Sequence, residues 1–470
     1  MHKRSKIIKR PAAGYMLVLG ATMLITVIGY AAIVTARINT RIVTGTNDWA
    51  RAGELAIATA ELAPLILAES PDWRTDLTSG EPVSFKLDGY EVNLVFIDED
   101  DDDFSTGLYD PIRAYGIAMV GDAVRVRSVL LTPNSTVPMS CLELAAYSVD
   151  GLVGLTATLS TNQMIGTAAG MTGLLLTING DVEYATTFLG VILNGTQNKA
   201  AEKRTMPDSS SVFDYYVNNG TAIPLDSLSS FDGRPSISDA VLTPTSNPYT
   251  GELNSEGIYV IDCDGGAINI VNSRIDGTLV LLNAADSLLS AHSAVVGQVT
   301  WKPAVPNYPA LMVQGQIDLD FEGGVAMKET TLGVNLNPIG SPYNGDEDAS
   351  LDDEYRSGIQ GIVYASDGTA LIGNSPYISG ALLSDAEMNL SGGTKATVNY
   401  SNRYYLDPPP GFGAGPYQPV VGTWRWDEAP CALNFTPCST DADCCSGTCN
   451  NGTGKCRPSA VVEIDVSLTK

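Results

Sequence analysis

A run of 20 residues near the N-terminus, Tyr15–Val34, is uncharged and almost wholly apolar. In a helix, a run of this length rises about 30 Å, which matches the hydrocarbon thickness of a bilayer. The 14 residues before it carry five Lys or Arg side chains and no acidic one. Because positively charged flanks stay in the cytoplasm, the sequence predicts one membrane-spanning helix, with the chain after Ala36 exported.

Two other interpretations of this run are the buried helix of a soluble core and a signal peptide cleaved after Ala36. The run is longer than a usual signal-peptide core, and small and apolar residues recur at helical spacing well beyond it. This pattern favours one long helix over 15–68, membrane-embedded in its first half and amphipathic in its second. Pro64 is a point where such a helix can bend.

The basic arm, the segment GYMLV at 14–18 and the Ala-rich stretch ARAGELAIATAELA together resemble PilX-like pilus assembly proteins. These are membrane-anchored minor pilins of type IV pilus and related secretion systems, and the resemblance covers about residues 1–130. It implies cleavage by a prepilin-type peptidase between Gly14 and Tyr15. Prepilins carry a Glu at the fifth position after the cut, where this chain has Leu19. Some tip-located pilin-like subunits also lack that Glu, so a tip or assembly role is implied rather than a place in the filament body.

The same resemblance implies partners and a location. The partners are the inner membrane and other pilin-like subunits, contacted through the N-terminal helix. The location is the bacterial inner membrane, single-pass and pilus-associated, with the bulk of the chain periplasmic or extracellular. The chain has 53 Asp and Glu against 27 Lys and Arg, a net charge of −26. Such acidity disfavours nucleic acid, so an extracellular protein or glycan is the remaining class of partner.

A charged fraction of only 17%, together with 46 glycines, indicates a mainly β body after the helix. Four short β-prone runs between 83 and 131 predict a small sheet, which with the helix gives a pilin-type layout. An acidic run, Asp98–Asp103, lies between two of them, and a second one falls within 346–354. Neither has the EF-hand spacing. Solvated loops are therefore favoured over Ca²⁺ sites.

From about Gly151 onward, a glycine between apolar residues recurs, with spacings of 15, 20, 18 and 19 residues where copies are adjacent. A period near 20 with Gly and Asn at the bends predicts the rungs of a parallel β-helix. A β-sandwich is the alternative, since its strands also come at short intervals with Gly turns. The Pro- and aromatic-rich stretch at 403–430 suits either a cap over an open end of the β core or a surface that binds sugar or peptide.

Six of the eight cysteines fall in 26 residues with the spacing C-x6-C-x5-CC-x3-C-x6-C. This cluster indicates disulfides in an oxidising compartment, with a structural zinc site as the rival interpretation. The spacing resembles the inhibitor cystine-knot (knottin) family. The resemblance implies three disulfides: Cys431 with Cys445, Cys438 with Cys449, and Cys444 with Cys456. Cys141 and Cys263 are left over, either paired with each other or as separate buried thiols.

The sequence carries little of the chemistry that enzymes use. Its histidines are His2 and His292, and there is no P-loop, no H-E-x-x-H and no G-x-S-x-G. We therefore expect no enzyme activity, no cofactor, no catalytic residue and no metal-binding residue. Carboxylate pairs keep one enzyme class open, a glycan-acting β-helix enzyme.

The predicted organisation follows from these features. It comprises a cytoplasmic arm (1–14), a transmembrane and amphipathic helix (15–68), a small pilin-like α+β region (69–150), a β-solenoid body (151–430), a cystine-knot-like module (431–456) and a terminal strand (457–470). The favoured function is a pilin-like structural or assembly component of a type IV pilus or pseudopilus. The alternative is a secreted or surface-anchored binding protein, an adhesin with no pilus role.

Overall fold

The computed structural model describes residues 12–70, 73–99, 101–104, 110–199, 203–209, 212–284, 294–428, 449–450 and 455–456. The chain divides into two compact units. A helix–sheet unit contains the N-terminal part up to Phe104, the segment Pro111–Leu131 and the chain from Pro419 onward. A solenoid unit contains Ser105–Asp110 and Thr132–Gln418.

The helix–sheet unit begins with the long helix α1 (Ala12–Glu61), followed by α2 (Ala63–Glu69) and α3 (Trp73–Asp76). At 50 residues, α1 is about 75 Å long. The helix is interrupted at Leu62, and Pro64 lies in the first turn of α2, where its missing N–H costs no hydrogen bond. The interruption therefore lies within two residues of Pro64, where the sequence allowed a bend.

Four antiparallel strands form the sheet of this unit: β1 (Pro82–Leu87), β2 (Tyr90–Asp98), β3 (Ile112–Val120) and β4 (Ala123–Pro133). The short strand β33 (Arg425–Trp426) pairs with β4, so the chain returns to this unit before residue 430. The strand β32 (Tyr417–Pro419) lies where the chain passes from one unit to the other. A hairpin, β34 (Cys449–Asn450) with β35 (Lys455–Cys456), places the backbones of Cys449 and Cys456 opposite each other.

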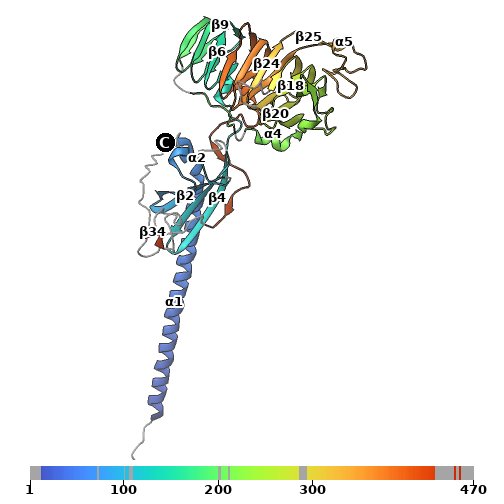
Figure 1. Cartoon of the computed structure of the whole chain (residues 1–470). Coiled ribbons are helices and arrows are strands. Elements are labelled where there is room, and N and C mark those ends of the chain that lie inside the picture. The colour runs from blue at the N-terminus through green and yellow to red at the C-terminus, as the bar shows by residue number, and fades with distance from the viewer. Residues whose placement is uncertain are drawn as a thin grey trace, which may run out of the picture. The chain divides into compact units, whose positions relative to one another are not determined.

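The solenoid unit is a parallel β-helix whose strands stack in three rows (Figure 1). The first row contains β5 (Ala146–Ser148), β8 (Ile165–Thr167), β10 (Val182–Tyr184), β12 (Gln197–Lys199), β13 (Thr221–Ala222), β17 (Ile258–Asp262), β20 (Thr278–Leu282) and β23 (Leu311–Gln314). The second contains β6 (Gly151–Leu155), β9 (Met171–Asn179), β11 (Phe188–Asn194), β14 (Ser229–Phe231), β15 (Arg234–Ser238), β18 (Ile268–Val271), β21 (Ala294–Val296), β24 (Ile317–Glu322), β28 (Ala370–Ser375) and β30 (Glu387–Leu390). The third contains β7 (Thr158–Thr161), β16 (Val241–Leu242), β19 (Ser273–Asp276), β22 (Val299–Lys302) and β31 (Lys395–Tyr400). The long strands β27 (Gly358–Ser366) and β29 (Tyr377–Ser384) turn a corner and belong to two rows.

Short elements outside the rows complete the unit. They are α4 (Asp214–Asn219), α5 (Glu329–Leu332), α6 (Arg403–Leu406), the 3₁₀ turns η1 (Ser140–Glu143) and η2 (Leu225–Ser227), and the hairpin of β25 (Ala326–Lys328) with β26 (Glu354–Arg356).

The order of rungs along the solenoid differs from their order along the chain. The early strand β5 pairs with the late strand β29 on one side and with β8 on the other. The rungs from β5 to β12 are thus stacked onto the final rung, while the chain from β13 to β31 builds the rest. At the β13 end, the antiparallel hairpin of β14 and β15 closes the stack.

The repeated glycines lie where successive rungs approach most closely. Gly361 and Gly380 are paired in register, and a Cβ on Gly380 would lie 2.0 Å from the carbonyl oxygen of Gly361. Gly195 stands in the same relation to Gly180, at 2.2 Å. No side chain fits at these distances, which explains why the sequence repeat is carried by glycine.

Three apolar clusters stabilise the described part of the solenoid, the smallest of them around Met327 and Tyr355 of the β25–β26 hairpin. The largest fills its interior with Val, Ile and Leu from all three rows. The second covers the outside of the first row, where α4, α6 and the segment around Phe412 pack against outward residues such as Tyr364 and Met312. Tyr404 and Phe412 therefore cover a side of the β-helix, in place of the end-cap expected for the aromatic stretch.

The fold class is confirmed, because the chain is mainly β after one long N-terminal helix and its body is a β-helix. Parallel pairing in all three rows excludes the β-sandwich. The solenoid strands begin at Ala146 and end at Tyr400, which differs from the expected limits of 151 and 430. Cys431, Cys438, Cys444 and Cys445, as well as the expected terminal strand, lie outside the described residues, so the cystine-knot resemblance stays a prediction.

Candidate functional site

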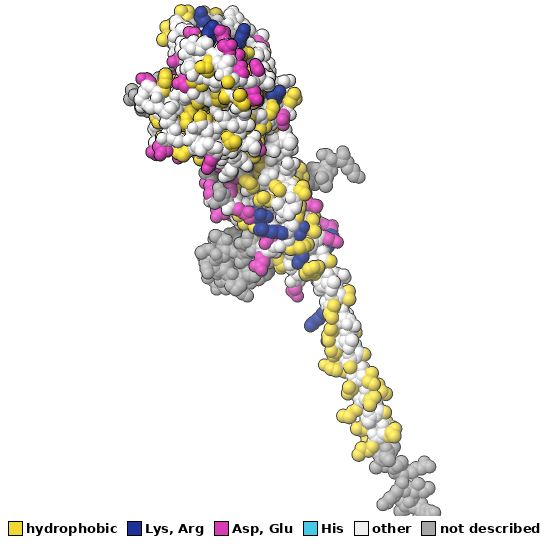
Figure 2. Space-filling model, turned by 90° about the vertical axis from the view of Figure 1, so that its right-hand side faces the viewer, with side chains coloured by type: hydrophobic (Ala, Val, Ile, Leu, Met, Phe, Trp, Pro, Cys, Tyr) yellow, Lys and Arg dark blue, Asp and Glu magenta, His cyan; other side chains and the backbone are white. Residues whose placement is uncertain are grey.

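The first half of α1 is an apolar rod that the described chain does not cover. From Tyr15 to Asn47 every side chain is exposed; Tyr15 is 75% and Leu24 63% exposed. Figure 2 shows these hydrophobic side chains all along the free part of the helix. The helix is long and apolar enough to cross a membrane, and none of its most apolar window is buried. Water is an unfavourable environment for such a surface.

The second half of α1 lies against the sheet of the same unit. Its buried face consists mainly of small residues: Ala52, Leu55, Ala56, Thr59, Ala60 and, in α2, Ala63. Opposite them stands Gly116 of β3, where a Cβ would lie 2.3 Å from the Ala56 carbonyl oxygen and 2.6 Å from the Ala60 nitrogen. Small residues on both surfaces allow this close approach, which explains the Ala-rich stretch of the sequence.

A stack of alternating rings and guanidinium groups ties α1 to the sheet. Arg125 of β4 lies 4.2 Å from the ring of Trp49 and 3.8 Å from that of Trp426. Arg127 lies 5.0 Å from Trp426, whose ring also packs over the gap left by Gly53 of α1. The sequence signalled the tryptophans near 424–426 but not their partners, since about 300 residues separate β33 from β4 in the chain.

The predicted processing residues and acidic runs are placed as follows. Gly14 and Tyr15 lie in the first turns of α1. In the first acidic run, Asp98 ends β2 and is buried, while Glu99 accepts hydrogen bonds from Arg113 at 2.5 and 3.2 Å. In the second run, Asp353 accepts one from Asn337 at 2.9 Å. Among the residues described, no group of three or more His, Cys, Asp and Glu is arranged to hold a metal ion.

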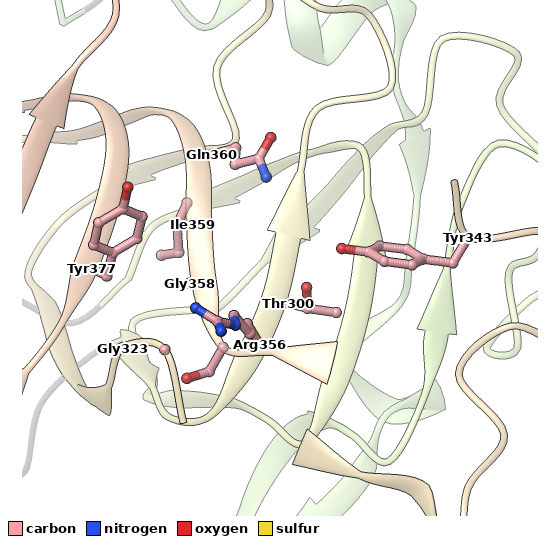
Figure 3. Close-up of a pocket in the computed structure, with 10 residues that line it drawn as sticks. Thr300, Gly323, Tyr343, Arg356, Gly358, Ile359, Gln360 and Tyr377 are labelled. Atoms are coloured by element: carbon pink, nitrogen blue, oxygen red, sulfur yellow. The ribbon is translucent and has the colours of Figure 1, made fainter. Parts of the chain in front are cut away.

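The solenoid unit carries a cleft of about 450 Å³ on the outside of its third row. Six polar side chains line it. Ser357 donates a hydrogen bond to the carbonyl oxygen of Glu322, whereas the other five make no hydrogen bond or ion pair with another described residue. These five are Thr300, Tyr343, Arg356, Gln360 and Tyr377. Figure 3 shows the Arg356 guanidinium between the two tyrosines, with the amide of Gln360 nearby. No sequence pattern marked any of these residues, because they come from four separate strands and a loop.

A buried arginine builds one wall of this cleft. Arg274, 1% exposed, donates hydrogen bonds to the carbonyl oxygens of Leu336, Ser341 and Pro342 at 2.7, 2.8 and 2.6 Å. These contacts hold the loop that follows α5 against β19. The loop in turn presents Tyr343, whose ring lies 5.1 Å from the Arg274 guanidinium. The wall is therefore fixed by a charged anchor rather than free to move.

On the opposite side, glycines, which have no side chain, keep the cleft open. A Cβ on Gly323 would lie 2.4 Å from the Cβ of Tyr377, and one on Gly358 would lie 3.4 Å from that ring. Tyr377 thus sits closely over two glycines. Arg356 is positioned by the β25–β26 hairpin, in which it pairs with Ala326.

Three other titratable groups of the solenoid, two thiols and one carboxyl, are largely buried. Cys141 and Cys263 are separate buried thiols, and burial raises the pKa of Cys263 to about 12, so this thiol is not a reactive nucleophile. Burial also raises the pKa of Asp385 to about 6, although a hydrogen bond from Tyr364 opposes the shift. His292 lies outside the described residues.

No protein-family model matches the chain, and no curated protein matches it. Among solved structures, the competence-associated pilin ComZ from Thermus thermophilus aligns with 81% of this chain and 98% of its own, at 11% identity and a TM-score of 0.30. An ice-binding protein from an Antarctic biological consortium aligns with 56% of this chain and 94% of its own, at 13% identity and a TM-score of 0.23. The DUF3494 domain of a Shewanella frigidimarina ice-binding protein aligns with 57% and 99%, at 11% identity and a TM-score of 0.22. Similarity at this level carries no argument, and the fold assignment rests on the strand pairing.

Proposed function

We propose that this protein is a membrane-anchored, pilin-like structural or assembly component of a type IV pilus or pseudopilus. The observation that carries the proposal is the division of α1 into two halves. The first is apolar and uncovered, and the second packs through alanines onto an antiparallel sheet. These two halves are what we expect of a helix that is anchored in the inner membrane and continues into a folded unit outside it.

The mechanism is physical. The apolar half of α1 holds the subunit in the bilayer, and the same surface packs against helices of other pilin-like subunits when assembly begins. Leu19 occupies the position where the resemblance expects a Glu, so the subunit lacks the carboxylate that would pair with a neighbour's new N-terminus. We therefore place it at a filament tip or in the assembly machinery, with the solenoid facing the exterior.

A charged residue placed in the apolar half of α1 tests whether this half anchors the protein in the membrane. Leu19→Lys places an ammonium group near one end of the apolar run, which costs about 3 kcal/mol at the centre of a bilayer and less toward its surface. We expect loss of membrane retention or of pilus assembly, measured by cell fractionation and by pilus counts. The matched control is Thr46→Lys, which adds the same charge at an exposed position beyond the apolar run and should leave membrane retention unchanged. Normal retention and normal assembly of the Leu19→Lys variant would contradict the proposal.

The mature N-terminus separates the proposal from its rivals. Mass spectrometry of the native protein should find a chain that starts at Tyr15, as prepilin-type processing requires, or one that retains the arm, as plain anchoring requires. A start near Arg37 would mean a secreted protein and would exclude the pilin role.

The second candidate is a surface-anchored binding protein without a pilus role, favoured by the cleft with its five unpaired polar side chains. Under both candidates we propose that the protein binds rather than catalyses. Turnover of a polysaccharide that disappears when one pair of carboxylates is replaced would overturn that view.

A further inference from the structure

We propose that the cleft formed by Tyr343, Arg356, Gln360 and Tyr377 binds a carboxylated sugar, a hexuronate unit of an acidic polysaccharide. The proposal concerns the solenoid alone and holds for an anchored or a secreted protein.

The charge of the cleft is the first argument. The chain carries 53 acidic side chains, yet none of the ten residues that line this cleft, all of them described, is Asp or Glu. Its single charged group is Arg356, whose guanidinium has no carboxylate partner among the described residues. A planar guanidinium matches a carboxylate through two parallel hydrogen bonds. A single guanidinium therefore matches a ligand that carries a single negative charge.

The neutral groups are the second argument. Around Arg356 stand two phenol hydroxyls, one carboxamide and the hydroxyl of Thr300, all without a hydrogen-bond partner among the described residues. Polar groups of this kind donate to and accept from hydroxyls, and a cluster of them left unpaired in a concave site indicates a ligand rich in hydroxyl groups. Phosphate would use the guanidinium and the donors of these groups, but it would leave their acceptor oxygens unused.

The shape is the third argument. Figure 3 shows Tyr343 and Tyr377 on opposite sides of the Arg356 guanidinium. Aromatic rings offer flat apolar surface beside a polar tip, which suits the C–H faces of a pyranose ring with its hydroxyls at the edge. The volume of about 450 Å³ lies in the range of small-ligand sites and leaves room for one or two sugar units.

The site is preorganised. Arg274 fixes the loop that carries Tyr343, and the glycines at 323 and 358 fix the approach of Tyr377. The hairpin register fixes the backbone of Arg356. A ligand that enters therefore has to order chiefly the Arg356 side chain, which lowers the entropic cost of binding.

Isothermal titration calorimetry of the full-length protein in detergent, with digalacturonate as the probe, tests the proposal. We expect saturable binding that weakens with salt, and at least about tenfold weaker binding of the neutral galactose disaccharide, because one charge-assisted pair accounts for a factor of this size. Arg356→Gln should remove that preference while leaving the weak affinity for the neutral sugar unchanged. Tyr343→Ala should weaken both ligands.

The control is Arg234→Gln, the same change in the β14–β15 hairpin and outside the cleft, which should leave binding unchanged. Arg356 is exposed, so its replacement should not unfold the protein, and thermal unfolding checks this. Equal affinity for the acidic and neutral disaccharides would overturn the proposal. An unchanged preference in Arg356→Gln would do the same, as would inorganic phosphate binding more tightly than digalacturonate.

Discussion

The two units of this protein differ in how their apolar surface is covered. In the solenoid, most inward Val, Ile and Leu side chains are covered by neighbouring rungs, and the outside of the first row has its own cover. The rung of β11 differs, because Leu189 and Ile192 are exposed. In the helix–sheet unit, about half of α1 has no cover at all among the described residues. The solenoid covers most of its inward apolar side chains itself, whereas the apolar half of α1 is left uncovered by the described residues.

Both units use glycine for close backbone contact, but for different neighbours. Gly380 lies against the backbone of the rung before it, and similar close contacts between rungs recur along the stack. Gly116 lies against the backbone of α1, and this contact is made at a single point. Substitution at each position therefore measures how much each unit depends on that contact.

Gly380→Ala should have the largest effect. Its Cβ would lie 2.0 Å from one backbone atom and 2.6 Å from the next, and backbone cannot move without breaking the register. We expect a loss of about 4 kcal/mol in the free energy of unfolding of the solenoid, measured by denaturant titration with hydrogen exchange of β27 and β29.

The control for this prediction is Gly392→Ala in the turn before β31, where the nearest atoms lie at 3.4 Å. It should be almost neutral. Equal stability of the Gly380 and Gly392 variants would show that the rungs are less tightly stacked than described.

Gly116→Ala should have the next largest effect, confined to the helix–sheet unit. The added methyl collides with the backbone of α1 at Ala56 and Ala60, and we expect a loss of about 3 kcal/mol with faster hydrogen exchange in β3. Gly45→Ala, in open space on the same helix, should instead stabilise it by about 1 kcal/mol. Faster exchange in the solenoid but not in β3 would contradict this assignment.

Asp385→Asn should have the smallest effect, visible as a change in pH dependence. Burial raises the pKa of Asp385 from 3.8 to about 6. Between these values the unfolded chain has lost the proton while the folded chain keeps it, so this group lowers the stability of the solenoid as the pH rises from about 4 to 6. The contribution is about 3 kcal/mol over the whole titration, and about 2 kcal/mol of it falls within this pH range.

The Asn variant stays neutral and can still accept the Tyr364 hydrogen bond, so its unfolding free energy should fall less over this pH range than that of the natural chain. Identical pH slopes for the two proteins would show that Asp385 titrates normally. Because the helix–sheet unit has no part in this group, its own exchange rates serve as the internal reference.

The sequence predicted those features that have a short period or a strong local signal. The apolar run at 15–34 marked α1, Pro64 marked its end, and the glycine repeat marked the solenoid. The cleft could not be predicted, because Tyr343 reaches it through a loop held by Arg274, and no local pattern reveals which distant carbonyls an arginine will contact. The Arg125–Trp426 contact was missed for the same reason.

The rung order has a consequence for how the protein is made. Asn162 and Tyr400, which share two hydrogen bonds, are 238 residues apart, and β5 lies beside β29. Because the chain is synthesised from its N-terminus, the rungs up to β12 exist long before β29, the late strand that flanks β5, has been made. Those early rungs have an open edge until then, so the solenoid can close only after β29 has left the ribosome.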